Sequence, residues 1–201
     1  IALRARRLGV LSDELHLVCT NDMAAALESL PGKKFLVVDS VQAMRADGEG
    51  GWPGSPAQVR AVAQMCISAA KEHSVPAVLV GHITKEGRIA GPMLLEHMVD
   101  GVLTFSGEDY SPYRMLRAGK NRFGSTEELG VFEMTETGLA EVGQPSGALL
   151  AGRTAGVAGS AIMTTMEGSR PLLVEVQALV TPTYLQVPRR LSVGIDNARL
   201  L

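Results

Sequence analysis

Two uninterrupted apolar runs, each ending in a polar residue, constrain the fold of this chain most strongly. Residues 34–39 read Lys-Phe-Leu-Val-Val-Asp, and residues 77–82 read Ala-Val-Leu-Val-Gly-His. The lack of alternation within each run is typical of strands buried on both faces of a parallel sheet. Between the runs, Ser55-Pro56 opens a helix to about His73, with an apolar stripe of Val59, Val62, Met65, Cys66 and Ala69. The sequence therefore predicts a β-α-β unit.

The flanking segments extend this unit to a β-α-β-α-β order, which predicts a doubly wound, mostly parallel α/β sheet. Asn21 or Asp22 is suited to cap the helix that precedes the first strand. The first residues are typical of the end of an amphipathic helix closed by Gly9. The expected elements are helices over residues 1–8, 23–30 and 93–98 and strands over residues 15–19 and 102–105.

After Gly107 the apolar pattern changes to a period of two, which predicts antiparallel strands at the edge of the sheet. Residues 143–147 read Gly-Gln-Pro-Ser-Gly, typical of a linker, so we expect one domain over residues 1–143 and a second, mostly β domain over residues 144–201. The predicted strands span residues 113–118, 129–134 and 139–142 in the first domain and 160–166 and 172–180 in the second.

Composition excludes several classes of protein. The 201 residues carry a formal net charge of −2, so nucleic-acid contacts have to come from local basic patches. The two cysteines, Cys19 and Cys66, have no partners at metal-ligand spacing, which argues against a disulfide framework or a zinc site and favours a reducing compartment. No apolar run approaches the ~20 residues that a membrane-spanning helix needs.

Asp39 ends the first buried strand and is the first candidate functional residue. Ligands of open parallel sheets bind at the carboxyl ends of the strands, where a carboxylate can hold Mg²⁺, as the Walker B acid does. The alternative role is to cap the following turn. A phosphate-binding loop of the form Gly-x4-Gly-Lys-Ser/Thr would accompany such an acid, but neither Gly32-Lys33 nor Gly119-Lys120 fits it. We expect that loop to precede Ile1, and phosphate binding to be severely weakened without it.

Two further groups of residues are candidates. His82, at the end of the second strand, is placed to sense a γ-phosphate, although it also suits a simple strand-end cap; Lys85 and Arg88 follow in a Gly-rich loop, as DNA contacts or as solvated charges. Lys120 and Arg122 lie two residues apart, so on an extended strand they point to one side and suit an anion such as a neighbouring subunit's γ-phosphate. Phe123 is expected to anchor the turn, and the alternative is that it stacks on a base.

The order of several strings along the chain resembles the bacterial RadA/Sms family of DNA repair ATPases. The strings are Leu3-Arg4-Ala5-x-Arg7-Leu8-Gly9, Val38-Asp39-Ser40-x-Gln42, Pro53-Gly54-Ser55-x-x-Gln58-Val59-Arg60, Gly81-His82-x-Thr84-Lys85, residues 90–100, Lys120-Asn121-Arg122-Phe123-Gly124, residues 130–135, Met166-Glu167-Gly168-x-Arg170-Pro171 and residues 174–180. The resemblance covers nearly the whole chain.

The resemblance implies a RecA-like ATPase core followed by the beginning of a Lon-protease-like α+β domain. It implies ATP and Mg²⁺ as cofactors, with Asp39 and Ser40 at the nucleotide and with Asp39, His82, Lys120 and Arg122 in catalysis. DNA contacts fall to Lys85, Arg88, Lys120 and Arg122. The family's zinc finger, Walker A loop and Gly-Glu-Glu-Ser-like stretch are not in this sequence, so we expect an internal fragment that does not hydrolyse ATP by itself.

In the complete protein, the resemblance implies a cytoplasmic hexameric ring that moves branched and single-stranded DNA in homologous recombination, with a recombinase as partner and a role in the stress response. Three alternatives remain open: another RecA-like ring ATPase, a non-catalytic assembly module, and a peptidase, for which the resemblance is the only support. We also expect exposed apolar surface on residues 1–8 and on the strands next to the absent phosphate-binding loop.

Overall fold

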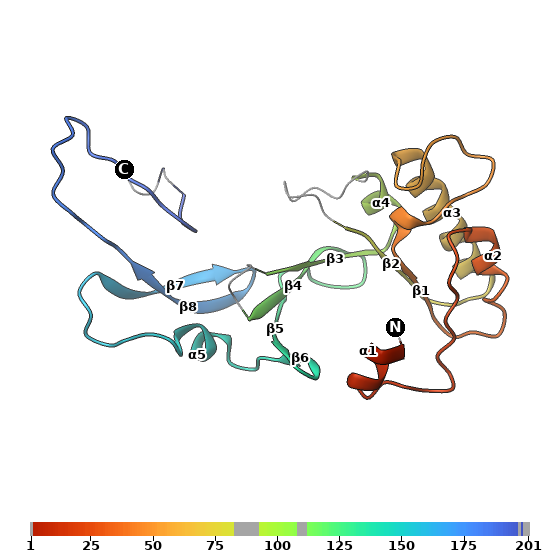
Figure 1. Cartoon of the computed structure of the whole chain (residues 1–201), viewed down its shortest axis with the longest axis horizontal. Coiled ribbons are helices and arrows are strands. Elements are labelled where there is room, and N and C mark those ends of the chain that lie inside the picture. Colours follow the sequence, from red (N-terminus) through yellow and green to blue (C-terminus); the bar gives the residue numbers. More distant parts are fainter. Residues whose placement is uncertain (1, 83–92, 108–111, 197, 199–201) are drawn as a thin grey trace. The chain divides into compact units, whose positions relative to one another are not determined.

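The computed structural model describes residues 2–82, 93–107, 112–196 and 198 (Figure 1). The chain forms two compact units. The first comprises residues 1–143 together with 167–170, and the second comprises residues 144–166 together with 171–201. None of the described helices is long and apolar enough to cross a bilayer.

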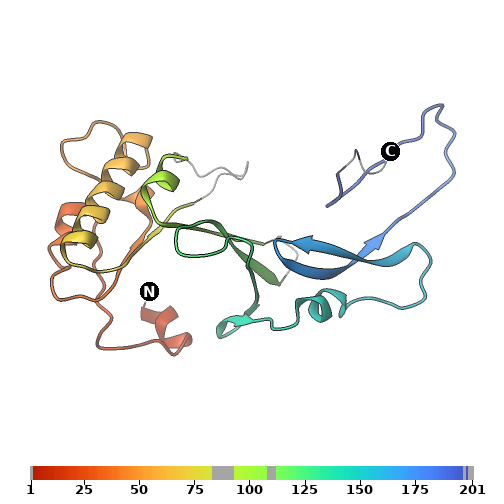
Figure 2. The same ribbon diagram turned by 180° about the vertical axis from the view of Figure 1, so that it is seen from behind.

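The predicted β-α-β unit is present in the first compact unit. Strands β1 (Leu36–Asp39) and β2 (Ala77–Val80) pair in parallel, in a register that places Asp39 opposite Val80. Helix α3 (Pro56–Glu72) connects them. Its N-terminus follows the predicted chemistry, because Pro56 occupies the first turn and the backbone N–H of Gln58 donates to Ser55 Oγ at 3.5 Å. Figure 2 shows α3 lying along the two strands.

The main core lies between α3 and one face of this strand pair. The α3 side chains of Val59, Val62 and Cys66 are fully buried and belong to the same core cluster as Val38 of β1. Helix α2 (Met23–Leu27) adds Met23, which is also fully buried, and the predicted Asp22 cap is confirmed, since its Oδ1 accepts from the backbone N–H of Ala24 at 2.9 Å. Burial of these aliphatic side chains provides the main stabilisation of the unit.

The opposite face of the strand pair is open, so the prediction that both strands are buried on two faces is wrong. Val37 is 57% exposed and its register partner Val78 is 45% exposed, while Val38, pointing the other way, is buried. Nothing among the described residues covers this face. Phe35 and, in helix α1 (Ala2–Arg7), Leu3 are exposed as well, which confirms the predicted apolar surface in these two segments.

The later strands form a sheet of their own, which corrects the prediction that they extend the first sheet. Their order is β3-β4-β5-β6, all antiparallel, and among the described residues β3 pairs with β4 and not with β2. The physical reason lies in β3, where half-buried and exposed residues alternate, as in antiparallel strands with one solvated face. The bounds are β3 Gly101–Ser106, β4 Tyr113–Asn121, β5 Leu129–Thr135 and β6 Gly138–Glu141.

Two short elements complete the first unit. Helix α4 (Met93–Met98) was predicted and packs against α3, with Leu95 on the main core. A single 3-10 turn, η1 (Val41–Ala43), follows β1. The predicted strand at residues 15–19 is wrong, because this segment has no regular structure and leaves Leu17 and Val18 more than half exposed. A strand needs a pairing partner, and none of the described strands pairs with it.

The described part of the second unit contains one helix and one strand pair. Helix α5 (Pro145–Leu150) begins inside the segment predicted to be a linker, and β7 (Ser160–Glu167) pairs with β8 (Arg170–Gln177). The Ser146 hydroxyl accepts a hydrogen bond from the backbone N–H of Leu173 at 3.1 Å, which ties α5 to β8. The strand predicted to reach residue 180 ends at Gln177, and Leu179 beyond it is 92% exposed.

Gln58 is a buried polar residue, and its replacement tests how much its hydrogen bonds to the loop before α3 stabilise the fold. Its amide accepts from the backbone N–H of Ala46 at 2.8 Å and donates to the carbonyls of Ala46 at 3.2 Å and Glu49 at 2.7 Å. We expect Gln58→Leu to lower the free energy of unfolding by about 1–3 kcal/mol, because the buried Ala46 N–H loses its partner. Urea titration measures this change. Gln64→Leu, on the exposed side of α3, is the control, and an equal loss there would contradict the role of Gln58.

The two cysteines are expected to differ in reactivity. Burial raises the pKa of the Cys66 thiol to about 11, whereas Cys19 is exposed. At pH 8 about one Cys66 in a thousand carries a thiolate, and only the thiolate attacks a disulfide reagent. Titration of the native chain with a chromogenic disulfide should therefore label Cys19 quickly and Cys66 only after denaturant is added. Fast labelling of two thiols in the native chain, or of one in the Cys19→Ser variant, would contradict this packing.

Candidate functional site

The carboxyl ends of β1 and β2 bring two predicted residues to one edge of the parallel strand pair. Asp39 is the last residue of β1 and is exposed. Its register partner in β2 is Val80, and His82 lies two residues after Val80. Ser40, next to Asp39, is 9% exposed. In open α/β sheets this edge is where ligands bind. We call Asp39, Ser40, Gln42 and His82 the strand-end cluster.

Gln42 joins the two strand ends, and sequence reasoning gave it no role. Its Nε2 donates to the backbone carbonyl of His82 at 3.4 Å, while its Oε1 is buried without a hydrogen-bond partner among the described residues. Gly54, whose φ is +83°, packs closely enough that a Cβ there would lie 3.3 Å from the Gln42 carbonyl oxygen. The glycine-rich loop before α3 therefore lies against this cluster. An amide three residues after a strand-end carboxylate was the available signal.

The strand-end cluster fits a magnesium nucleotide in one respect. Mg²⁺ is usually held by one or two carboxylates together with substrate phosphates and waters, rather than by an all-protein cage. Asp39 makes no ion pair with any described residue, and the described part of the chain contains no group of three His, Cys, Asp or Glu residues that suits a metal.

Lys120 binds its own chain. This residue lies near the end of β4 opposite Val102, next to a bulge in which Gly119 has no register partner. Its ammonium group donates to the backbone carbonyls of Glu96 and Val99, both at 2.6 Å. These carbonyls belong to the C-terminal turn of α4 and the residue just beyond it, where a helix lacks internal donors. Lys120 thus acts as a C-terminal cap for α4.

Arg122 contacts the same segment through an exposed ion pair. Its Nη1 lies 2.9 Å from Asp100 Oδ1, with the two side chains 56% and 60% exposed, and its backbone N–H donates to the Asp100 carbonyl at 3.0 Å. The two cations therefore point to one side. No hydrogen bond or ion pair between described residues joins them to the strand-end cluster. Lys85 and Arg88 lie outside the described residues.

The turn after β4 is held by Asn121 rather than by Phe123. The Asn121 side chain accepts from the backbone N–H of Phe123 at 3.0 Å and donates to the carbonyl of Ser125 at 3.1 Å. Phe123 is 85% exposed, so the expectation that it anchors the turn is wrong. An Asn side chain that hydrogen-bonds the backbone two residues ahead stabilises such a turn by itself, which leaves the aromatic ring in solvent.

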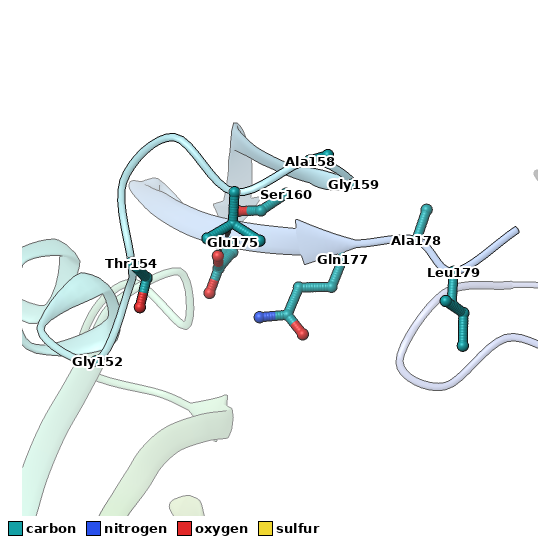
Figure 3. A pocket seen from close by; sticks show the side chains of 10 residues that line it. Gly152, Thr154, Ala158, Gly159, Ser160, Glu175, Gln177, Ala178 and Leu179 are labelled. Carbon is teal, nitrogen blue, oxygen red and sulfur yellow. Dashed lines mark hydrogen bonds between the residues drawn. The ribbon is translucent and has the colours of Figure 1, made fainter.

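The second unit contains a cavity of about 360 Å³ with several polar groups (Figure 3). The Ser160 hydroxyl is hydrogen-bonded to Glu175 Oε1, and Arg153 Nε lies 3.9 Å from the same oxygen. Thr154 and Gln177 also line the cavity. Its lining contains neither lysine nor histidine, so Ser160 has no general base of the Ser/Lys or Ser/His type within it. This cavity gives no support to the peptidase alternative.

The Arg122–Asp100 pair is expected to contribute little to stability. Exposed ion pairs are screened by water and typically contribute less than about 1 kcal/mol. Asp100→Asn should therefore change the free energy of unfolding by less than about 1 kcal/mol in urea titrations. Lys120→Met, which removes two short bonds to α4, provides the comparison. A loss for Asp100→Asn as large as that for Lys120→Met would show that the exposed pair is a structural link.

Comparison with known proteins gives close relatives by sequence. No protein-family model matches the chain. The chain is 50% identical to DNA repair protein RadA of Bacillus subtilis and 49% identical to that of Halalkalibacterium halodurans, each over 98% of this chain and 44% of the relative. It is 49% identical to DNA repair protein RadA of Brucella abortus, over 100% of this chain and 44% of the relative.

Two solved structures share weaker similarity. They are the RadB recombinase, with a TM-score of 0.43 and 18% identity over 60% of this chain and 59% of that chain, and a KaiC-like protein from Pyrococcus horikoshii, with a TM-score of 0.40 and 17% identity over 60% and 56%. Assignment of the chain therefore rests on the sequence relatives. The chain spans 44% of the length of those relatives and matches them over nearly all of its own length, and it belongs to the family of proteins named DNA repair protein RadA.

Proposed function

We propose that this chain is part of a DNA-dependent ATPase that acts in homologous recombination and DNA repair, and that drives branch migration on branched and single-stranded DNA. The supporting observation is the strand-end cluster: a carboxylate with no ion pair among the described residues, the amide of Gln42 and a histidine lie at the carboxyl ends of a parallel strand pair, the edge where open α/β sheets bind ligands. Sequence identity near one half to the RadA proteins supplies the repair context.

In this proposal Asp39 and Ser40 hold Mg²⁺-ATP at the carboxyl edge of a RecA-like core. The bound metal nucleotide supplies the phosphoryl group that is transferred to water. Asp39 is suited to the metal because its carboxylate is exposed and unpaired among the described residues. Gln42 transmits a change at this edge to the end of β2, because its amide holds the carbonyl of His82.

The DNA contacts follow from the order of the chain. His82 directly precedes residues 83–92, in which we place Lys85 and Arg88 as ligands of DNA phosphates. A shift of His82 on nucleotide hydrolysis would move the start of this segment, which couples the strand-end cluster to DNA. Arg122, whose guanidinium is exposed, would contact the nucleotide of a neighbouring subunit in a hexameric ring. A recombinase is the expected further partner.

The second unit is proposed to be the beginning of a Lon-protease-like domain that contributes to assembly of the ring. A non-catalytic role is favoured for the 201 residues by themselves, since they contain no Gly-x4-Gly-Lys-Ser/Thr string to hold phosphates. Equilibrium dialysis of the isolated chain with labelled ATP distinguishes a non-catalytic unit from one that binds nucleotide by itself. Micromolar binding would show that the chain carries a sufficient nucleotide site of its own.

Asp39→Asn in the gene product that contains this chain tests the ATPase assignment. We expect Mg²⁺-dependent, DNA-stimulated ATP hydrolysis to fall by about 100-fold or more, because an amide does not replace a metal-binding carboxylate. Phosphate release measured with and without single-stranded DNA gives the rates. Asp47→Asn, in the exposed loop before α3, is the matched control. Undiminished turnover in the Asp39 variant would remove the basis for this function.

A further inference from the structure

Helix α4 depends on contacts from outside itself. It has only six residues, and a helix of that length is not stable in water without tertiary support. Leu95 packs against the main core, and the ammonium group of Lys120 binds the carbonyls of Glu96 and Val99 at the other end. A cation at a helix C-terminus is favoured both by these bonds and by the helix dipole.

The two cations of the Lys-Asn-Arg segment differ in how firmly they are held. Lys120 is half-buried and uses two of its three protons on carbonyls at 2.6 Å. Arg122 is more than half exposed, and its one side-chain partner among the described residues, Asp100, is equally exposed. A guanidinium in such a pair exchanges one anion for another at little cost, whereas Lys120 would have to release the end of a helix.

Resting on the proposed function, we propose that these cations have separate roles. Lys120 is a positioning residue that fixes α4 of its own chain, and Asp100 holds Arg122 until a phosphate group of the neighbouring subunit's nucleotide replaces it. Lys120 therefore acts within one subunit and Arg122 acts between two. Their shared side and two-residue spacing predict a pair of equivalent cations that bind one anion. The proposed roles are instead different.

The position of α4 in the chain gives Lys120 its functional importance. Residues 83–92 lie between His82 and Met93, the first residue of α4. The His82 carbonyl, just before this segment, is bound by Gln42, and the C-terminal end of α4, the helix that follows the segment, is bound by Lys120. The residues proposed to contact DNA are therefore followed in the chain by a helix whose far end Lys120 holds.

Hydrogen exchange on the 201-residue chain tests the positioning role without any nucleotide. The Val99 N–H donates to the Leu95 carbonyl at 3.2 Å and reports on the last turn of α4. We expect Lys120→Met to accelerate exchange at Val99 by about tenfold or more, and Lys120→Arg, which keeps cationic donors, to restore most of the protection. Arg122→Gln should leave the Val99 rate within about twofold of wild type.

Lys71→Met is the matched control for this measurement. Lys71 also lies in the last turn of a helix, α3, but the described structure contains no side-chain hydrogen bond from it. Its substitution should leave the Val99 rate unchanged. An unchanged Val99 rate in Lys120→Met, or equal acceleration in Arg122→Gln, would overturn the assignment of Lys120 as the residue that holds α4.

Mixing of variants in the gene product that contains this chain distinguishes action within a subunit from action between subunits. In a mixed ring, an Arg122→Gln subunit still has an intact Asp39, and an Asp39→Asn subunit still has an intact Arg122. An interface to which the first contributes Asp39 and the second contributes Arg122 therefore has both functional residues. We expect an equal mixture to recover up to about one quarter of wild-type DNA-stimulated turnover, the share of such interfaces in randomly mixed heterologous rings. A mixture of Lys120→Met with Asp39→Asn should recover none.

Recovery with Lys120→Met, or no recovery with Arg122→Gln, would overturn the division of roles. The two levels of the proposal fail in different ways. If the wild-type gene product does not hydrolyse ATP, the proposed function is wrong, and the exchange of Val99 still decides whether Lys120 positions α4.

Discussion

Packing of α3 on one face of the β1–β2 pair is the interaction on which the rest of the first unit depends. The α3 residues Val59, Val62 and Cys66 are fully buried there, and the parallel register that this packing requires places Asp39 beside Val80. Two strands that enter the same core in parallel must also leave it at the same edge. Packing of the core therefore places the residues of the strand-end cluster at one edge, and no attraction between their polar groups is needed for this.

Side-chain amides, rather than charges, connect this core to the loops around the strand ends. Gln58 satisfies backbone groups of Ala46 and Glu49, and Gln42 holds the carbonyl of His82. An amide suits this position because it donates and accepts at once and has no charge to desolvate. Gln58 of α3 therefore fixes the loop before that helix, and Gln42 of η1 holds the segment after β2. Asp39 makes no ion pair with any described residue.

The elements that could be predicted are those whose signal is local. The run from Lys34 to Asp39 and the Ser55-Pro56 cap contain their own evidence, so the β-α-β unit followed from the sequence. What failed is the choice of partners for strands: β3 pairs with β4, its neighbour in the chain, instead of joining β1 and β2, and residues 15–19 have no partner strand among those described. In the candidate site, Asp39 and His82 were found because they end apolar strands. Gln42 and Asp100 were given no role because their partners, the His82 carbonyl and Arg122, lie 40 and 22 residues away in the chain.

The difference between Lys120 and Arg122 shows why spacing alone does not assign roles to charged residues. Both point toward residues 96–100, as two residues apart on an extended chain predicts. What separates them is the chemistry of their partners. Helix carbonyls are fixed acceptors that need a donor wherever the helix ends, so the Lys120 ammonium is committed to them. An exposed carboxylate is satisfied equally well by water, so Asp100 gives up Arg122 readily. In the proposed ring, a phosphate of the neighbouring subunit, with more charge than one carboxylate, would compete for the arginine and leave the lysine in place.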